Sequence, residues 1–126
     1  MALTSILITG NHNSRGFEVL ANGTARWIPR SLFEYLLELV TQIWATKSGF
    51  LFTQDVLSTE GDEERTRQVV HRLREELVDY QAIVNGRKSY RLACEAQDIA
   101  VDDSLFEVPS GILDPRILGR LKNGAA

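Results

Sequence analysis

The sequence predicts an α+β fold with a small N-terminal antiparallel sheet, three helices, a C-terminal β-hairpin and a short helical extension. Two Asn-Gly dipeptides, Asn22-Gly23 and Asn85-Gly86, lie between short apolar segments and are typical of two-residue hairpin turns. Between them, apolar residues recur at helical spacing. The 126 residues, 44% hydrophobic and 25% charged, have an ordinary globular composition and are enough for one domain without disulfides.

The N-terminal part of the chain, residues 5–28, predicts the antiparallel sheet. Its strands are expected at Ser5–Thr9, Phe17–Leu20 and Thr24–Ile28. The segment Gly10–Gly16 is rich in turn-forming residues and is expected to join the first two strands. Asn22-Gly23 supplies the two positive-φ positions of a type I′ turn between the second strand and the third.

The central part, residues 30–80, predicts three helices. Pro29 and Ser31 begin the first, and Lys47-Ser48-Gly49 ends it. Its apolar stripe consists of Leu32, Tyr35, Leu36, Leu39, Val40 and Ile43. Thr53 is a good N-cap for a short second helix that continues to Leu57 or Ser58. Asp62 is expected to cap the third, which covers about residues 62–79 and has acidic residues at its N-terminus.

The C-terminal part predicts a hairpin and then a separate extension. Residues 82–93 form the hairpin around Asn85-Gly86 and complete a first unit, 1–94. Residues 95–126 are an acidic linker, extended over Glu95–Asp103, followed by a short helix that begins at Asp114-Pro115. A helix this short is not stable alone in water. It therefore needs a surface that covers its apolar residues, either its own core or a second copy in a homodimer.

Charge is unevenly distributed along the chain. The net charge is −3, whereas a basic domain is the usual signature of nucleic-acid binding. Two windows are nevertheless free of acidic residues, Arg65–Arg74 and Tyr80–Cys94, and they contain seven of the 14 lysines and arginines. Both windows fall on the predicted third helix and hairpin, so these two elements are the candidate interface.

Three helices followed by a hairpin, with a basic third helix, form the winged helix-turn-helix arrangement. We therefore expect double-stranded DNA as the partner, with the third helix in the major groove and the hairpin, the wing, on the backbone. Gln68 and His71 are expected at base edges with Arg67 beside them, and the remaining cations at phosphates. The predicted DNA-binding residues are Arg65, Arg67, Gln68, His71, Arg72, Arg74, Arg87 and Lys88. The alternative is a solvated helix face whose arginines pair with glutamates one turn away.

Short motifs in this region resemble a known family. Arg72-Leu73-Arg74-Glu75-Glu76-Leu77 is similar to the Arg-Leu-Arg-x-x-Leu of the recognition helix in OmpR/PhoB-type response-regulator effector domains. Tyr90-Arg91-Leu92 is similar to the Tyr-Arg-Leu that closes their wing, and Pro29-Arg30-Ser31-Leu32 to their Pro-x-x-Phe. The resemblance covers about residues 5–94 and implies a winged-helix, DNA-binding transcription regulator. The segment after the wing has no counterpart in that family.

Other function classes find little support in the sequence. Cys94 is the single cysteine, so no internal disulfide is expected, and a cytoplasmic location fits a reducing compartment. No signal peptide or membrane span is expected. His12 and His71 lack partners at metal-ligand spacing, and we find no phosphate-binding glycine loop or nucleophile–base arrangement. We therefore expect no enzyme activity, metal, cofactor or small-molecule ligand. The alternative to DNA binding is a winged-helix protein–protein interaction module or subunit of a larger assembly, which the overall acidity favours.

Overall fold

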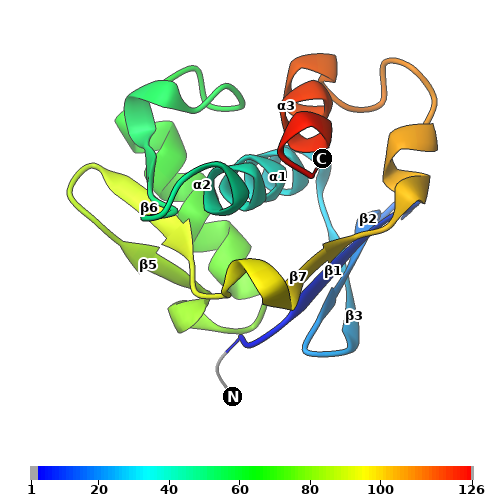
Figure 1. The fold of residues 1–126 in the computed structure, drawn as a ribbon, viewed down its shortest axis with the longest axis horizontal. Helices are drawn as coiled ribbons and strands as arrows, with labels where there is room; N and C mark the ends of the chain where they lie inside the picture. The colour runs from blue at the N-terminus through cyan, green and yellow to red at the C-terminus, as the bar shows by residue number, and fades with distance from the viewer. Residues whose placement is uncertain (1–2, 126) are drawn as a thin grey trace.

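A long helix, α1 (Arg30–Ala45), runs through the middle of the molecule and lies between two sheets (Figure 1). The computed structural model describes residues 3–125 and has an α+β fold. The other two α-helices are α2 (Glu63–Glu76) and α3 (Pro115–Ala125). The four-stranded sheet lies on one side of α1, and α2 with the three-stranded sheet lies on the other (Figure 1). No helix among the described residues is long and apolar enough to cross a membrane.

The four-stranded sheet has the strand order β3-β2-β1-β7. Its strands are β1 (Ile6–Asn13), β2 (Gly16–Ala21), β3 (Thr24–Ile28) and β7 (Ile99–Val101). The first three are antiparallel, as the sequence predicts, and Asn22 and Gly23 have the positive φ values of the predicted type I′ turn, 51° and 82°. The turn-rich segment Gly10–Gly16 is mostly strand, because β1 continues to Asn13 after an irregularity in register between Ile8 and His12.

Helix α1 is buried around most of its circumference. Eight apolar side chains of this helix are buried, and Glu38 is buried with them. The apolar residues are Leu32, Phe33, Tyr35, Leu36, Leu37, Leu39, Val40 and Ile43. Leu32, Phe33, Tyr35, Leu36, Leu37, Leu39 and Val40 have no exposed surface. A helix with so wide an apolar face has to be covered from several sides, and this requirement determines where the other elements lie.

The predicted second helix is wrong. The chain from Thr53 forms one turn of 3-10 helix, Thr53–Asp55, and then a series of turns up to Gly61. Glu38 accounts for the difference, since its carboxylate accepts hydrogen bonds from the backbone N–H groups of Leu57 (2.7 Å) and Ser58 (3.1 Å). The Ser58 hydroxyl donates a third, at 2.6 Å. A side chain from another element thus satisfies donors that would otherwise bond within a helix.

Helix α2 and the second sheet occupy the other side of α1. The strands are β4 (Leu51–Phe52), β5 (Ile83–Asn85) and β6 (Ser89–Leu92), in the antiparallel order β4-β6-β5. The Asp62 side chain caps α2 by accepting a hydrogen bond from the Arg65 N–H, as predicted. The helix ends at Glu76, three residues before the predicted end at Asp79, and Val78 has a left-handed φ of 55°.

The hairpin between β5 and β6 turns at different residues from those predicted. Neither Asn85 nor Gly86 has a positive φ, whereas Lys88 has a φ of 53°. The Gly86 N–H donates to the Ser89 carbonyl at 2.9 Å, so the turn is centred on Arg87-Lys88. Gly86 is required for space, because a Cβ there would lie 2.4 Å from Ser89 Oγ and 2.8 Å from the Phe50 ring. The cations consequently occupy the tip of the hairpin.

The segment after the hairpin packs against the N-terminal part of the chain. Within Glu95–Asp103, predicted as an extended surface segment, β7 pairs in parallel with β1. A 3-10 helix, Asp103–Glu107, then lies so close to β1 that a Cβ on Gly10 would be 2.2 Å from the Ser104 carbonyl oxygen. Two more 3-10 turns occur at Tyr80–Ala82 and Ala96–Asp98.

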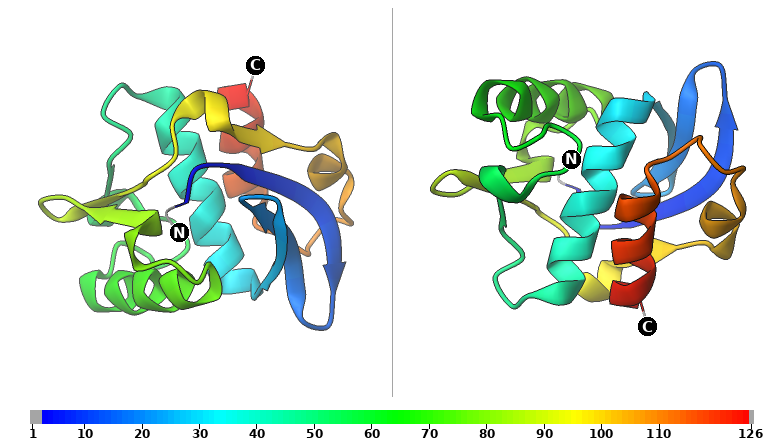
Figure 2. Two further views of the ribbon diagram at one scale, coloured as in Figure 1. Left: turned by 90° about the horizontal axis from the view of Figure 1, so that it is seen from below. Right: turned by 90° about the horizontal axis from the view of Figure 1, so that it is seen from above.

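Helix α3 begins at Pro115, as Asp114-Pro115 predicts, and packs on α1 (Figures 1 and 2). The Asp114 carboxylate accepts a hydrogen bond from the Arg116 N–H at 2.9 Å, and the Asp114 N–H donates to Glu34 at 2.7 Å. Ile117 and Leu121 are buried, with 1% and 0% of their surface exposed. The apolar face of α3 is therefore covered by its own chain; a homodimer stays a prediction.

The contribution of α3 to stability is testable with Leu121→Ala. Truncating a fully buried leucine should lower the free energy of unfolding by about 2–5 kcal/mol, because a cavity remains beside α1. Lys122→Ala, an exposed substitution in the same turn, should change it by no more than about 0.5 kcal/mol. Chemical denaturation followed by circular dichroism measures both, and equal stabilities for the two variants would contradict the packing of α3 on α1.

Candidate nucleic-acid interface

The exposed face of α2 carries the residues that the sequence places at base edges. Thr66, Val70 and Leu73 are buried on the side that faces the core. The opposite side exposes Glu64, Arg67, Gln68, His71, Arg72 and Glu75. A shallow depression of about 530 Å³ lies along this face and is lined by Glu64, Arg67, Gln68, His71 and Arg72. Four predicted site residues are thus brought together on one surface.

Several of these side chains pair with acids on or next to the same helix. Arg67 forms an ion pair with Glu64, which also accepts a hydrogen bond from Gln68 at 3.4 Å. His71 Nε2 lies 2.8 Å from Glu75, and Arg65 lies 3.3 Å from Glu60. The hydrogen bond from Arg67 lowers the pKa of the Glu64 carboxyl below its ordinary value. Exposed pairs of this kind are weak, so they can open when a stronger partner approaches.

Three predicted cations have no such partner. The side chains of Arg72, Arg87 and Lys88 are exposed and form no ion pair or hydrogen bond with any residue in the range 3–125. Arg72 lies on α2, whereas Arg87 and Lys88 form the tip of the hairpin. These positions are available to phosphate groups without breaking an interaction within the protein.

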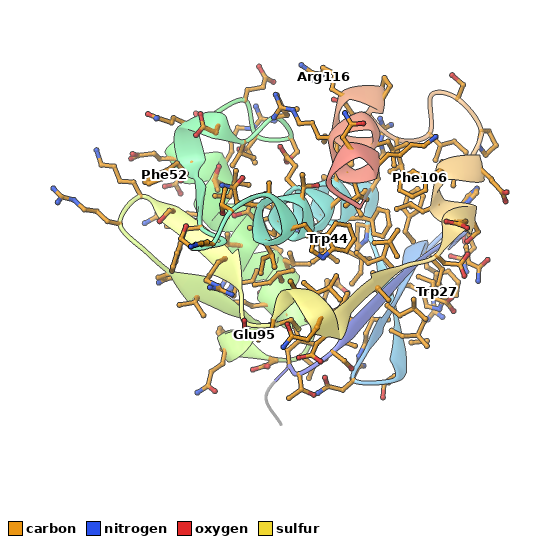
Figure 3. The ribbon with its side chains drawn as sticks, in the orientation of Figure 1. Trp27, Trp44, Phe52, Glu95, Phe106 and Arg116 are labelled. Carbon is orange, nitrogen blue, oxygen red and sulfur yellow. The ribbon has the colours of Figure 1, made fainter. Side chains whose placement is uncertain are left out.

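A cleft connects the hairpin tip to the N-terminal end of α2. It has a volume of about 340 Å³ and is lined by Phe52, Thr53, Gln54, Gly61, Glu63, Arg87 and Lys88. A neighbouring hollow of about 220 Å³ is lined by both Arg67 and Lys88. Phe52 is 49% exposed and lies beside the hairpin (Figure 3). The exposed Phe52 ring lines the same cleft as Arg87 and Lys88, and no sequence pattern indicates it because β4 has only two residues.

Arg74 has a different environment from the other predicted contacts. One terminal nitrogen of its guanidinium donates to the Ile83 carbonyl at 2.6 Å and to Asn85 Oδ1 at 2.7 Å. Its Nε is buried and has no hydrogen-bond partner among the described residues. The side chain is therefore bound to the hairpin rather than free for a phosphate.

Apolar side chains are exposed next to the C-terminal end of α2. Val78 and Tyr80 are 65% and 66% exposed, and Val84 on β5 is also exposed. The Tyr80 ring lies 6.2 Å from the His71 ring, centroid to centroid. Tyr80 lies beyond the end of α2 at Glu76, after the left-handed Val78 changes the direction of the chain.

The described part of the chain has few groups that could bind a metal ion or act as a nucleophile. Residues 3–125 contain no cluster of three or more His, Cys, Asp or Glu side chains that could hold a metal ion. Cys94 is buried, and burial raises the pKa of its thiol to about 11, so the thiol is protonated at neutral pH. Trp27 and Trp44 lie on the far side of α1 from the hairpin (Figure 3).

No protein-family model matches the chain, and neither the curated proteins nor the solved structures provide a match.

The candidate site consists of the exposed face of α2 and the tip of the hairpin, which lie on the same side of α1 (Figure 2). A cleft joins them, and both carry unpaired cations.

Glu38 supports this surface because it holds the turn that leads into α2. Burial raises the pKa of its carboxyl above the ordinary 4.5, against the lowering effect of its hydrogen bonds to Ser58 and Leu57. A raised pKa in the folded state means that the folded protein binds this proton more tightly than the unfolded chain does. The stability that results is complete below pH 4.5 and is lost as pH rises through the raised pKa.

The variant Glu38→Gln tests this assignment. The difference in unfolding free energy, wild type minus variant, should fall as pH rises from about 4.5 and level off above the raised pKa. Glu76→Gln serves as the control, because Glu76 is exposed and its side chain forms no hydrogen bond or ion pair within residues 3–125. Denaturation series between pH 4 and pH 8 measure both, and parallel curves for wild type and Glu38→Gln would contradict the buried carboxylate.

Proposed function

We propose that the chain is a winged-helix domain that binds double-stranded DNA in a sequence-specific way and acts as a cytoplasmic transcription regulator. The element order α1, β4, α2, β5, β6 and the strand order β4-β6-β5 support this, because a winged helix needs them. In this proposal α2 is the recognition helix and the β5–β6 hairpin is the wing. The 3-10 turn Thr53–Asp55 stands where the usual second helix would lie.

The observation that carries the proposal is the set of three unpaired cations. Arg72 flanks the exposed face of α2, and Arg87 and Lys88 form the tip of the wing. A helix in the major groove has the DNA backbone on both sides of it, and the wing reaches the backbone one step further along. Cations at these positions would contact phosphates while the helix face between them meets the bases.

The exposed face of α2 has the chemistry for base recognition. Gln68 can bond to adenine N6 and N7, and Arg67 can bond bidentately to guanine once it leaves Glu64. Glu64 and Glu75 can accept from the amino group of cytosine. Acids on the recognition face also repel phosphates, so a misaligned duplex is disfavoured.

A protein partner is the second candidate, and the exposed Val78, Tyr80 and Val84 favour it. Apolar side chains beside a helix face whose charges are already paired resemble a protein contact more than a DNA contact. In that case the domain would be a protein–protein interaction module, and the wild type would not bind duplex DNA even at low salt.

The salt dependence of duplex binding tests the proposal. We expect the wild type to bind random duplex at low salt, with an affinity that falls as salt rises. Arg87→Ala and Arg72→Ala should each make the slope of log affinity against log salt shallower by about 0.9, because each variant loses one phosphate contact. Arg15→Ala is the control, since the β1–β2 turn lies across α1 from the wing (Figure 2).

Fluorescence anisotropy at four or more salt concentrations measures the slopes of the wild type and the three variants. Absence of wild-type binding at the lowest salt would reject DNA binding and favour the protein partner. Equal losses for Arg15→Ala and Arg87→Ala would show that the contacts lie elsewhere.

Base recognition by α2 makes a separate prediction for Arg67→Ala. Selection from randomised duplexes should give the wild type a preferred site, and the variant should lose the preference at one position with about a tenfold weaker affinity for that site. Glu76→Ala, on the same helix, should leave both the preference and the affinity unchanged. An identical selected site for Arg67→Ala and wild type would place the base contacts on other residues.

A further inference from the structure

We propose that Arg74 is a positioning residue that fixes the wing against α2 and thereby sets the spacing at which helix and wing engage a duplex. This inference rests on the proposed function for its DNA part. It assigns to Arg74 a task unlike that of the other arginines on α2, which would contact DNA directly.

Arg74 lies on α2, and its side chain forms hydrogen bonds with the β5–β6 hairpin. Its Nη2 donates to the Ile83 carbonyl (2.6 Å) and to Asn85 Oδ1 (2.7 Å), at the two ends of β5. It is the only one of the four arginines on α2 that is not exposed. The guanidinium thus links the recognition helix to the outer strand of the wing.

Strand β5 needs such a link because it lies at the edge of its sheet. The order β4-β6-β5 leaves one side of β5 without a strand partner, and β5 has only three residues. The hydrogen bond to Ile83 occupies a backbone carbonyl of this strand, and charged donors make stronger bonds than neutral ones. No other hydrogen bond among the described residues joins α2 to the β5–β6 hairpin, which is otherwise fixed by the pairing of β6 with β4.

Asn85 has a role in this arrangement that differs from the one its sequence context indicates. It precedes Gly86 but does not form the turn, because its φ is not positive. Its side chain instead accepts the hydrogen bond from Arg74. The nitrogen that makes both bonds, Nη2, is held in the rigid plane of the guanidinium, whereas a lysine ammonium at the end of a flexible chain does not fix both.

The relative placement of helix and wing matters because both touch one rigid partner. A binding site loses its complementarity when its parts deviate by more than about 0.5 Å or 10–20° from the productive geometry. Loosening the wing should therefore weaken duplex binding at every salt concentration while the number of phosphate contacts stays the same. A phosphate contact by Arg74 itself would instead change the salt slope.

The experiment compares Arg74→Gln, Arg74→Lys and Asn85→Ala with Arg72→Gln in two measurements. The first is the salt series with random duplex, and the second is amide hydrogen exchange at Gly86, whose N–H bonds across the wing to Ser89. A melting curve for each variant shows whether the variant is folded at the temperature of both measurements. Asn85→Ala breaks the same link in a second way, since it removes the side-chain acceptor of the Arg74 hydrogen bond and alters no charge.

We expect Arg74→Gln and Asn85→Ala to weaken binding about tenfold with an unchanged salt slope, and Arg72→Gln to make the slope shallower by about 0.9. Exchange at Gly86 should quicken in Arg74→Gln, Arg74→Lys and Asn85→Ala but not in Arg72→Gln. A shallower slope for Arg74→Gln, full affinity for Arg74→Lys, or unchanged exchange at Gly86 would each overturn the assignment. Wild-type protein that binds no duplex would overturn the proposed function, while the exchange measurement still reports on the link between α2 and the wing.

Discussion

The burial of α1 around most of its circumference is the constraint on which the rest of the structure depends. A helix with so wide an apolar face cannot leave that face in water, so other elements must cover it from several sides. The four-stranded sheet covers one side, and α2 with the three-stranded sheet covers another. Helix α3 covers the remaining part, with Ile117 and Leu121 fully buried. The segment after residue 94 thus completes the core, and each burial of a leucine or isoleucine contributes on the order of 1.5–3 kcal/mol before entropy is counted.

Glu38 is the one acidic residue on the buried surface of α1, and it shapes the side of the molecule that we propose binds DNA. A buried carboxylate is costly unless donors surround it, and here Leu57 and Ser58 provide three. The segment that provides them cannot also be a regular helix, because two of its N–H groups point at the carboxylate. The chain therefore reaches α2 through turns, with Glu60 and Gly61 both at positive φ. This compact connection leaves the cleft beside Phe52 and Gly61 next to the wing tip.

The sequence predicts those elements whose signals are local, and fails where a distant residue decides. The periodicity of α1, the Asp62 cap and the Asn22-Gly23 turn depend on neighbours within a few positions, and all three are confirmed. The helix expected after Thr53 is absent because Glu38, on another element, binds that segment. Position 86 requires glycine because a Cβ there would clash with the Phe50 ring, and not because its φ is positive. Strand β7 is three residues long and pairs with a strand from the other end of the chain, so no pattern within it could reveal its partner. For the candidate site, helical spacing groups Arg67, Gln68, His71 and Arg72 correctly on one exposed face, but the bond from Arg74 to Asn85 requires the fold itself.

The charge balance of α2 bears on how a domain with an acidic net charge could still select a DNA sequence. The helix carries four arginines and four glutamates, so it offers no net attraction to phosphates. In the proposed complex, the attraction comes from the few cations without partners, Arg72, Arg87 and Lys88, and a small number of phosphate contacts gives weak binding to random sequence. Glu64 and Glu75 remain beside the bases and cost free energy wherever no amino group faces them. A correct site compensates for the opened Glu64–Arg67 pair with a guanine for the arginine, whereas an incorrect site leaves both charges without a partner. Discrimination between DNA sequences then depends on the penalty at wrong sequences as much as on the gain at the right one. It also depends on a wing that is held firmly, so that the helix cannot shift to avoid the penalty.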